Sequence, residues 1–267
     1  MDIDDYLEAI RREGPLLLAA AAGAGLDAPV PSCPGWDVRD LVRHVAGVHH
    51  WAARQVGGRR TDELTGDLVD IVGGWPPDDE LLDWAAEQHA TLVAVLRRAD
   101  RSFPYFTWLP GTTPFTMWTR RQAHETAVHR MDAELAEGTT TPFAPDFAAD
   151  GVDELVMAMV GNLRKPIPVE RDRVLRLRAT DAGREWTAIL TPEGFETHAG
   201  RHGDADCTLS GPAEGLYRAV WHRGGESLDV EGDPSVLEAW WQAVRPAGAD
   251  RALGVAEATL LATERKG

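Results

Sequence analysis

Cysteine and long apolar runs are scarce in this sequence of 267 residues, and each scarcity excludes a class of protein. The two cysteines, Cys33 and Cys207, lie far apart without the short spacing of a thiolate metal site, so both are expected to be free thiols. A transmembrane helix needs about 20 mainly apolar residues, whereas the longest apolar run, 16–22, stops at Gly23. The sequence therefore predicts neither a disulfide-stapled domain nor a membrane protein.

Positive charge is also scarce, because 27 Lys and Arg residues face 43 Asp and Glu residues, for a formal net charge of −16. A strongly acidic chain repels polyanions, so nucleic acid is not expected as a partner. The first ten residues are acidic, unlike the basic start of a secretory signal, and a cytoplasmic location is expected. The local exception is a set of arginines that alternate with apolar residues, as on the solvent-exposed face of a strand: Arg171, Arg173, Arg176 and Arg178.

The first half of the chain has the pattern of helices. Its apolar residues recur with a period of about 3.6, and proline or glycine separates the periodic segments. Asp37 is a candidate N-cap, and Thr113 is another, followed by proline at the first helical position. Four long helices joined by Pro- and Gly-rich connections predict an up-down four-helix bundle over residues 1–145. The expected helices cover residues 2–22, 37–56, 78–98 and 113–137.

The pattern changes near residue 146. After one further apolar helix at 147–163, short alternating runs separated by turn residues predict antiparallel hairpins. The fold class is therefore α+β with two domains, and the second, residues 146–267, is expected to be a small antiparallel-sheet α+β domain. Its expected strands lie at 174–178, 186–190, 195–198 and 207–209, and its later helices at 212–223 and 234–244.

The most informative chemical pattern lies on the fourth expected helix. Glu125 and His129 are spaced i, i+4, so their side chains project from one face, one turn apart, as in a pair that binds a metal. Such a pair also arises often on a solvated helix face. Here the flanking Ala127, Val128 and Met131 place it near the buried stripe, where a carboxylate and an imidazole need partners.

A third metal ligand is available on the second expected helix. His44 lies on its inward stripe beside Leu41 and Val48, whereas two further histidines, His49 and His50, lie one turn later at its edge. The tryptophans at 36, 51 and 118 are expected in the core or a pocket wall. The histidines at 89, 198, 202 and 222 are expected to be ordinary surface residues.

The segment from Cys33 to Gly47, CPGWDVRDLVRHVAG, closely resembles the N-terminal motif of the mycothiol-dependent maleylpyruvate isomerase family. That family belongs to the DinB-like metal-binding four-helix bundles. Its E-x-x-x-H-x-x-D run matches Glu125, His129 and Asp132. Segments 207–214, 221–223 and 230–234 resemble its C-terminal domain, a small fold similar to sterol-carrier proteins. The resemblance covers the chain from about residue 5 to about residue 245.

This resemblance implies that His44, Glu125 and His129 bind a divalent metal, usually zinc in this family, although Ni²⁺ or Fe²⁺ would suit the same ligands. It also implies the low-molecular-weight thiol mycothiol as cosubstrate. An open coordination position would favour its thiolate, which then adds to an electrophilic substrate. The expected protein is a mycothiol-dependent isomerase or S-transferase. The sequence fixes neither the electrophile nor the oligomeric state.

Two residues have expected supporting roles, each with a simpler alternative. Asp132 could orient His129 by accepting its hydrogen bond, or could be a solvated aspartate. By the resemblance, Arg223 lies where the family carries an arginine thought to face the site; it could bind a substrate carboxylate, or interact with a helix C-terminus. Two other functions remain open: a non-catalytic DinB-like metal-binding or stress protein, and a metal-dependent hydrolase.

Overall fold

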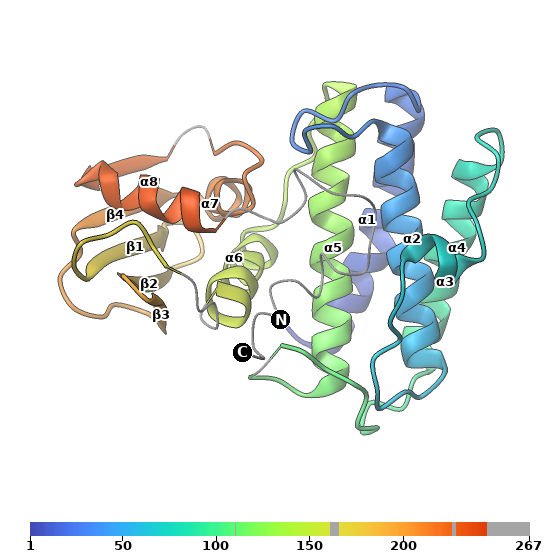
Figure 1. Cartoon of the computed structure of the whole chain (residues 1–267), viewed down its shortest axis with the longest axis horizontal. Helices are drawn as coiled ribbons and strands as arrows, with labels where there is room; N and C mark the ends of the chain where they lie inside the picture. The colour runs from blue at the N-terminus through green and yellow to red at the C-terminus, as the bar shows by residue number, and fades with distance from the viewer. Residues whose placement is uncertain (110, 161–165, 226–227, 245–267) are drawn as a thin grey trace. The chain divides into compact units, whose positions relative to one another are not determined.

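The computed structural model of the chain describes residues 1–109, 111–160, 166–225 and 228–244. The chain divides into two compact units, with the boundary between Thr141 and Pro142. The first unit is helical and the second contains the sheet (Figure 1). None of the described helices combines the length and the hydropathy that crossing a membrane requires.

Four long helices build the first unit, as predicted. Helix α1 packs along α5 and α2 packs along α4 (Figure 1). Asp37 begins α2 with a capping box, in which its side chain accepts from the backbone N–H of Asp40 and the Asp40 side chain accepts in return. A short helix that the sequence did not predict, α3 (Leu68–Val72), precedes α4. The long helices are α1 (Ile3–Ala24), α2 (Val38–Gly57), α4 (Leu81–Arg98) and α5 (Pro114–Glu137).

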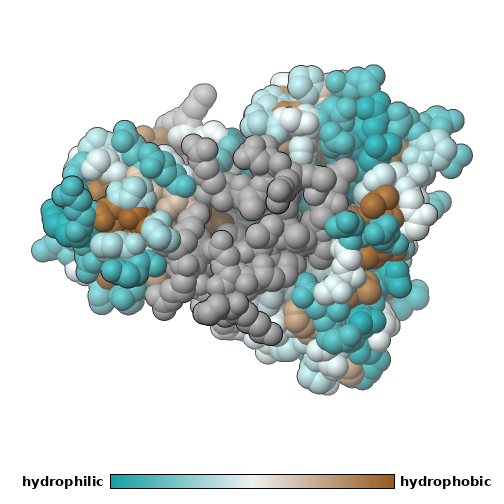
Figure 2. Space-filling model, viewed as in Figure 1, coloured by the Kyte–Doolittle hydropathy of each residue, from teal (hydrophilic) through white to brown (hydrophobic). Residues whose placement is uncertain are grey.

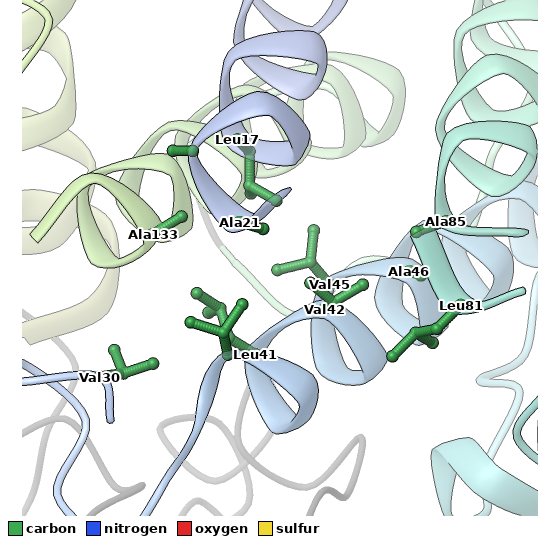
Figure 3. Close-up of a cluster of buried hydrophobic side chains, with 12 residues drawn as sticks. Leu17, Ala21, Val30, Leu41, Val42, Val45, Ala46, Leu81, Ala85 and Ala133 are labelled. Atoms are coloured by element: carbon green, nitrogen blue, oxygen red, sulfur yellow. The ribbon is translucent and has the colours of Figure 1, made fainter. Parts of the chain in front are cut away.

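Apolar side chains from the long helices meet in a common core, where Leu17, Val45 and Ala85 lie close together (Figure 3). Contrary to the expectation of a surface residue, His89 of α4 is buried, and its Nε2 donates to the carbonyl of Ile10, 2.9 Å away. Gly14 makes this approach of α4 to α1 feasible, because a Cβ there would lie 2.2 Å from Nε2 of His89.

The second unit begins with α6 (Pro145–Asp153) and a π-helical turn, η1 (Glu154–Met159); the predicted end of this helix at residue 163 lies outside the described residues. A five-stranded sheet follows, with the strand order β3-β2-β1-β4-β5. Helices α7 (Ala213–Val220) and α8 (Pro234–Ala243) contact β1 and β4. The strands are β1 (Arg173–Ala179), β2 (Arg184–Thr191), β3 (Gly194–Ala199), β4 (Cys207–Gly211) and β5 (Asp229–Gly232).

The sheet is mixed, which corrects the prediction of a purely antiparallel one. Strands β1 and β4 pair in parallel, because segment 200–206 carries the chain from β3, across β2 and β1, to the far side of β1. Strand β5 was not predicted, since all four of its residues are exposed and show no alternation of burial. The predicted helix 212–223 is also shorter and ends at Val220.

The surface of the described residues is mainly hydrophilic on the face shown in Figure 2. Of the large apolar side chains that the structure describes, only Met1 and Val230 are exposed, at 45% and 48%. One arginine of β1 departs from the predicted solvated face: Arg176 is buried, whereas Arg178 is exposed.

Candidate metal centre

Three side chains from two helices of the first unit converge on one point. His44 of α2 and both Glu125 and His129 of α5 each offer one ligand atom, and these atoms all lie within 4.8 Å of one another. Glu125 Oε1 lies 3.1 Å from Nε2 of His44 and 3.3 Å from Nε2 of His129. Donors about 2.0–2.1 Å from a tetrahedral zinc ion lie roughly 3.3 Å apart, so this donor set suits a divalent cation.

Local sequence explains why the three meet. The i, i+4 spacing on α5 stacks Glu125 and His129 on one face. On α2, Leu41 and Val45 are almost completely buried, which confirms the predicted stripe and turns His44 inward with them. Trp36 forms a wall beside the cluster, with its ring centroid 5.1 Å from that of His44 and 6.4 Å from that of His129.

Burial and mutual attraction set the charges of the metal-free cluster. Burial lowers the pKa of His44 and would also lower that of His129, but the attraction of Glu125 and Asp132 raises the pKa of His129 to about 9. Burial alone would raise the pKa of Glu125; the charge of His129, hydrogen bonds from both histidines and the charge of Arg121 hold it well below its ordinary value. Near neutral pH the metal-free cluster therefore holds an ionised Glu125, a protonated His129 and a neutral His44.

Asp132 lies directly behind the cluster. Its Oδ2 accepts from Nδ1 of His129 at 2.8 Å, and its carboxylate is fully inaccessible to solvent, so the alternative of a solvated aspartate is wrong. Ser32 donates to Oδ1 at 2.5 Å, and the Cys33 thiol lies 3.5 Å from Oδ2. A carboxylate in this position fixes the imidazole so that Nε2 faces the cluster.

Arg121 of α5 is almost completely buried and was not predicted from the sequence as part of the site. Its guanidinium donates to Oε2 of Glu125 at 2.9 Å, while Oε1 of Glu125 faces the two histidines. The spacing of four residues before Glu125 was a signal that could have found this ion pair. Ser32 and Cys33 had no such signal, because they lie about a hundred positions from Asp132.

The neighbouring histidines of α2 point to other partners. Nε2 of His49 lies 3.0 Å from the Thr126 hydroxyl, and Nδ1 of His50 lies 2.8 Å from Oε1 of Gln88. Neither belongs to the three-ligand group. Cys33 and Cys207 are not joined in a disulfide in the described part of the chain.

Arg223 belongs to the second unit, three residues past the end of α7. Its side chain is buried, and Nη1 donates to the carbonyl of Trp221 at 2.6 Å. This contact resembles the simpler alternative for Arg223, an arginine that satisfies carbonyls at a helix C-terminus. The role of Arg223 toward a substrate stays a prediction.

Comparisons with known proteins cover both units. Residues 7–134 match the mycothiol maleylpyruvate isomerase N-terminal domain, and residues 146–239 match the C-terminal domain of the same family. Among solved structures, the mycothiol-dependent maleylpyruvate isomerase is 13% identical with a TM-score of 0.59, over 86% of this chain and 93% of that one. A histidine-to-alanine mutant of that isomerase matches over the same shares with a TM-score of 0.60 and 13% identity. No curated protein matches the sequence significantly. At this identity the structural likeness shows the fold.

Proposed function

Since this chain belongs to the mycothiol-dependent maleylpyruvate isomerase family, we propose that it is a metal-dependent enzyme that uses mycothiol to attack an electrophilic small molecule. One observation carries the proposal: three ligand atoms from two helices lie within 4.8 Å of one another in a buried site. Two imidazoles and one carboxylate leave at least one coordination position for an incoming group, as in catalytic rather than structural zinc sites.

His44, Glu125 and His129 would hold the ion, which we propose to be Zn²⁺; the same ligands also accept Ni²⁺ and Fe²⁺. A divalent ion held there would favour the thiolate form of a bound thiol, whose ordinary pKa near 8.5 leaves it mostly protonated at neutral pH. Binding of the ion must displace the proton that the metal-free protein holds on His129.

The remaining residues of the site position the ligands. Asp132 accepts the Nδ1 proton of His129 and so presents the Nε2 lone pair. Arg121 donates to Oε2 of Glu125, which leaves Oε1 to bind the ion together with the two histidines. The guanidinium would also offset the charge of Glu125, so that a bound divalent ion with Glu125, Arg121 and Asp132 would leave a net charge of about +1, which would attract an anionic thiolate.

For the substrate step we favour isomerisation over S-transfer. The thiolate sulfur forms a bond to one carbon of a substrate double bond, and the electron pair moves toward a conjugated carbonyl. Rotation about the resulting single bond and loss of the thiolate then restore the double bond in the trans form. In S-transfer the C–S bond would persist. Arg223 is proposed to bind a substrate carboxylate.

The test begins with metal analysis of protein purified without added metal, followed by turnover with mycothiol. We expect about one equivalent of a divalent ion, and cis-to-trans conversion of a conjugated cis-enoic acid only when mycothiol is present. A stable S-conjugate with a generic electrophile would instead identify a transferase. Cleavage of a substrate by water without thiol would identify a hydrolase, and metal without turnover would identify a binding protein.

The ligand assignment is tested with a matched pair of variants. His129→Ala is expected to lose the metal and at least 100-fold of the activity, because two ligands remain where three are needed. His49→Ala, which removes a buried imidazole five residues beyond His44, is expected to keep the metal. The opposite pattern would show that the wrong histidine has been assigned.

A further inference from the structure

The second unit buries an arginine that has no carboxylate partner among the described residues. Arg176 of β1 is 8% exposed; Nη2 donates to the carbonyl of Gly203 at 2.7 Å, and Nε has no acceptor. By contrast, Arg173 on the same strand pairs with both Asp206 and Asp233. A guanidinium carries five donors and a permanent charge, so leaving it buried with one neutral acceptor is costly.

A histidine that also has a buried nitrogen without a hydrogen-bond partner lies in the same cross-strand row as this arginine. Across the sheet, Arg176 of β1 pairs with Thr187 of β2, and Thr187 pairs with His198 of β3. Side chains alternate along a strand, so these three share one face, opposite Leu175 and Leu177. Nε2 of His198 is buried and has no hydrogen-bond partner.

Segment 200–206 crosses the sheet on this face and covers the row of Arg176, Thr187 and His198. The Thr187 hydroxyl donates to the carbonyl of Gly200 at 2.9 Å and accepts from the backbone N–H of His202 at 3.1 Å. The His202 ring stacks on His198, with centroids 4.0 Å apart and planes 9° apart. Because His202 is exposed, the cluster reaches solvent at its rim.

The surroundings hold charges of both signs, but none of the described carboxylates pairs with Arg176. Arg178, the next residue of β1 on this face, is exposed and makes a 3.4 Å contact with the Ser210 hydroxyl. Glu185 lies opposite Arg178 in register, yet no ion pair joins them in the described part of the chain. In a protein with a net charge of −16, a buried guanidinium without a carboxylate partner among the described residues is unexpected. The charge of Arg176, in the same row as His198, also opposes a divalent cation there, which argues against a metal at the histidine pair.

We propose that Arg176, His198 and His202 form a binding site for the oxyanion group of a small molecule, a carboxylate or a phosphate. The planar guanidinium fork matches two oxygens of either group, and Nε2 of His198 supplies a further donor. The site lies wholly within the second unit and does not depend on the proposed enzymatic function.

The test titrates the full chain with inorganic phosphate and, separately, with succinate, at constant ionic strength balanced with NaCl. The readouts are the side-chain Nε–H resonance of Arg176 in ¹H–¹⁵N spectra and the binding isotherm. We expect one of the two anions to shift that resonance saturably, with a Kd in the millimolar range or tighter. The anion that binds more tightly identifies the source of the oxyanion.

Three variants distinguish binding at these specific residues from general electrostatic attraction to the protein surface. Arg176→Met should weaken binding at least tenfold. His198→Phe, which keeps a ring to stack on His202 but removes Nε2, should weaken it at least threefold. Arg171→Met makes the same change of charge at a 72% exposed side chain and should leave Kd within twofold.

Equal weakening by Arg171→Met, or no saturable shift with either anion, would overturn the proposal. If Arg176→Met does not fold, His198→Phe decides the question, since an unchanged Kd in that variant would also overturn it.

Discussion

At the level of single residues, the two oxygens of Glu125 have different partners. Oε1 faces His44 and His129, while Oε2 accepts from Arg121. Arg121 therefore determines how Glu125 can meet an ion: it occupies one oxygen and fixes the orientation of the other. Partners that orient a metal ligand in this way commonly contribute 10- to 100-fold to metal affinity.

We expect Arg121→Met to weaken zinc binding by roughly 10- to 100-fold, because Glu125 loses the contact that fixes its rotamer. Competition with a chelating dye measures this affinity directly. Arg120→Met, which makes the same charge change one position earlier on α5, is the matched control and should bind zinc nearly as the wild type does. Equal losses of zinc affinity in both variants would mean that the total positive charge of α5, rather than the contact of Arg121 with Glu125, determines the affinity.

His49 gives a prediction about pH. Burial, assisted by the neighbouring charge of His89, lowers the pKa of His49 well below its ordinary value. Below about pH 6.5 the unfolded chain takes up a proton at this residue and the native state does not, so stability falls toward acid by up to about 1.4 kcal/mol per pH unit. His129 has the opposite sign: its raised pKa contributes stability below about pH 6.5 that is lost as the pH rises through about 9.

A comparison of variants isolates the contribution of His49 from that of His129. Metal-free His49→Gln should lose less stability than the wild type between pH 7.5 and pH 5.5, as measured by urea unfolding at each pH. Parallel pH profiles for wild type and His49→Gln would contradict the prediction.

At the level of helices, the close approach of α4 to α1 depends on the absence of a side chain at Gly14. A Cβ there would lie 2.2 Å from Nε2 of His89, whose ring is buried and bonded to the carbonyl of Ile10. We expect Gly14→Ala to lower the free energy of unfolding by up to about 2 kcal/mol, because an overpacking cost of about 1–3 kcal/mol outweighs the gain of about 1 kcal/mol in helix propensity.

Gly57 on α2 provides the control for this substitution. A Cβ at Gly57 would meet only ordinary contacts with Val95, at 3.5 Å and beyond. Gly57→Ala should therefore leave stability unchanged or raise it slightly, as chemical denaturation would show. A stable Gly14→Ala protein would mean that His89 can move aside at little cost.

The helices and strands differ in how well the sequence could predict them. Helices were predictable wherever a local signal begins or ends them, as Asp37 and Thr113 do. Strand β5 and the parallel pairing of β1 with β4 were not, because exposed strand residues carry no alternation and a strand's own pattern does not reveal its neighbour. The burial of Arg176 was hidden for the same reason: it depends on segment 200–206 crossing that row.

The candidate site was predictable to the same extent. The Glu125 and His129 pair follows from helical spacing alone, and His44 from its place on the buried stripe of α2 together with the family motif. The contacts of Ser32 and Cys33 with Asp132 join distant segments and follow only from the folded chain.

At the level of the whole molecule, each unit has a core of its own. The helical unit buries the cluster of Figure 3, and the second unit buries Trp186 and Trp240. The proposed metal ligands belong to the first unit alone, and the proposed oxyanion site belongs to the second. A ligand stabilises only those states that bind it, so each ligand should protect its own unit from opening.

Hydrogen exchange followed by mass spectrometry tests this separation in the full chain. Zinc should slow amide exchange in α2 and α5 at least tenfold, because opening of either helix separates His44 from the Glu125 and His129 pair. Peptides from β1 and β2 should exchange at the same rate with and without zinc. His129→Ala should abolish the protection of α2 and α5 and leave the strands unchanged. Equal protection of helices and strands by zinc would mean that the two units open as one cooperative body, and that binding in one is energetically coupled to stability in the other.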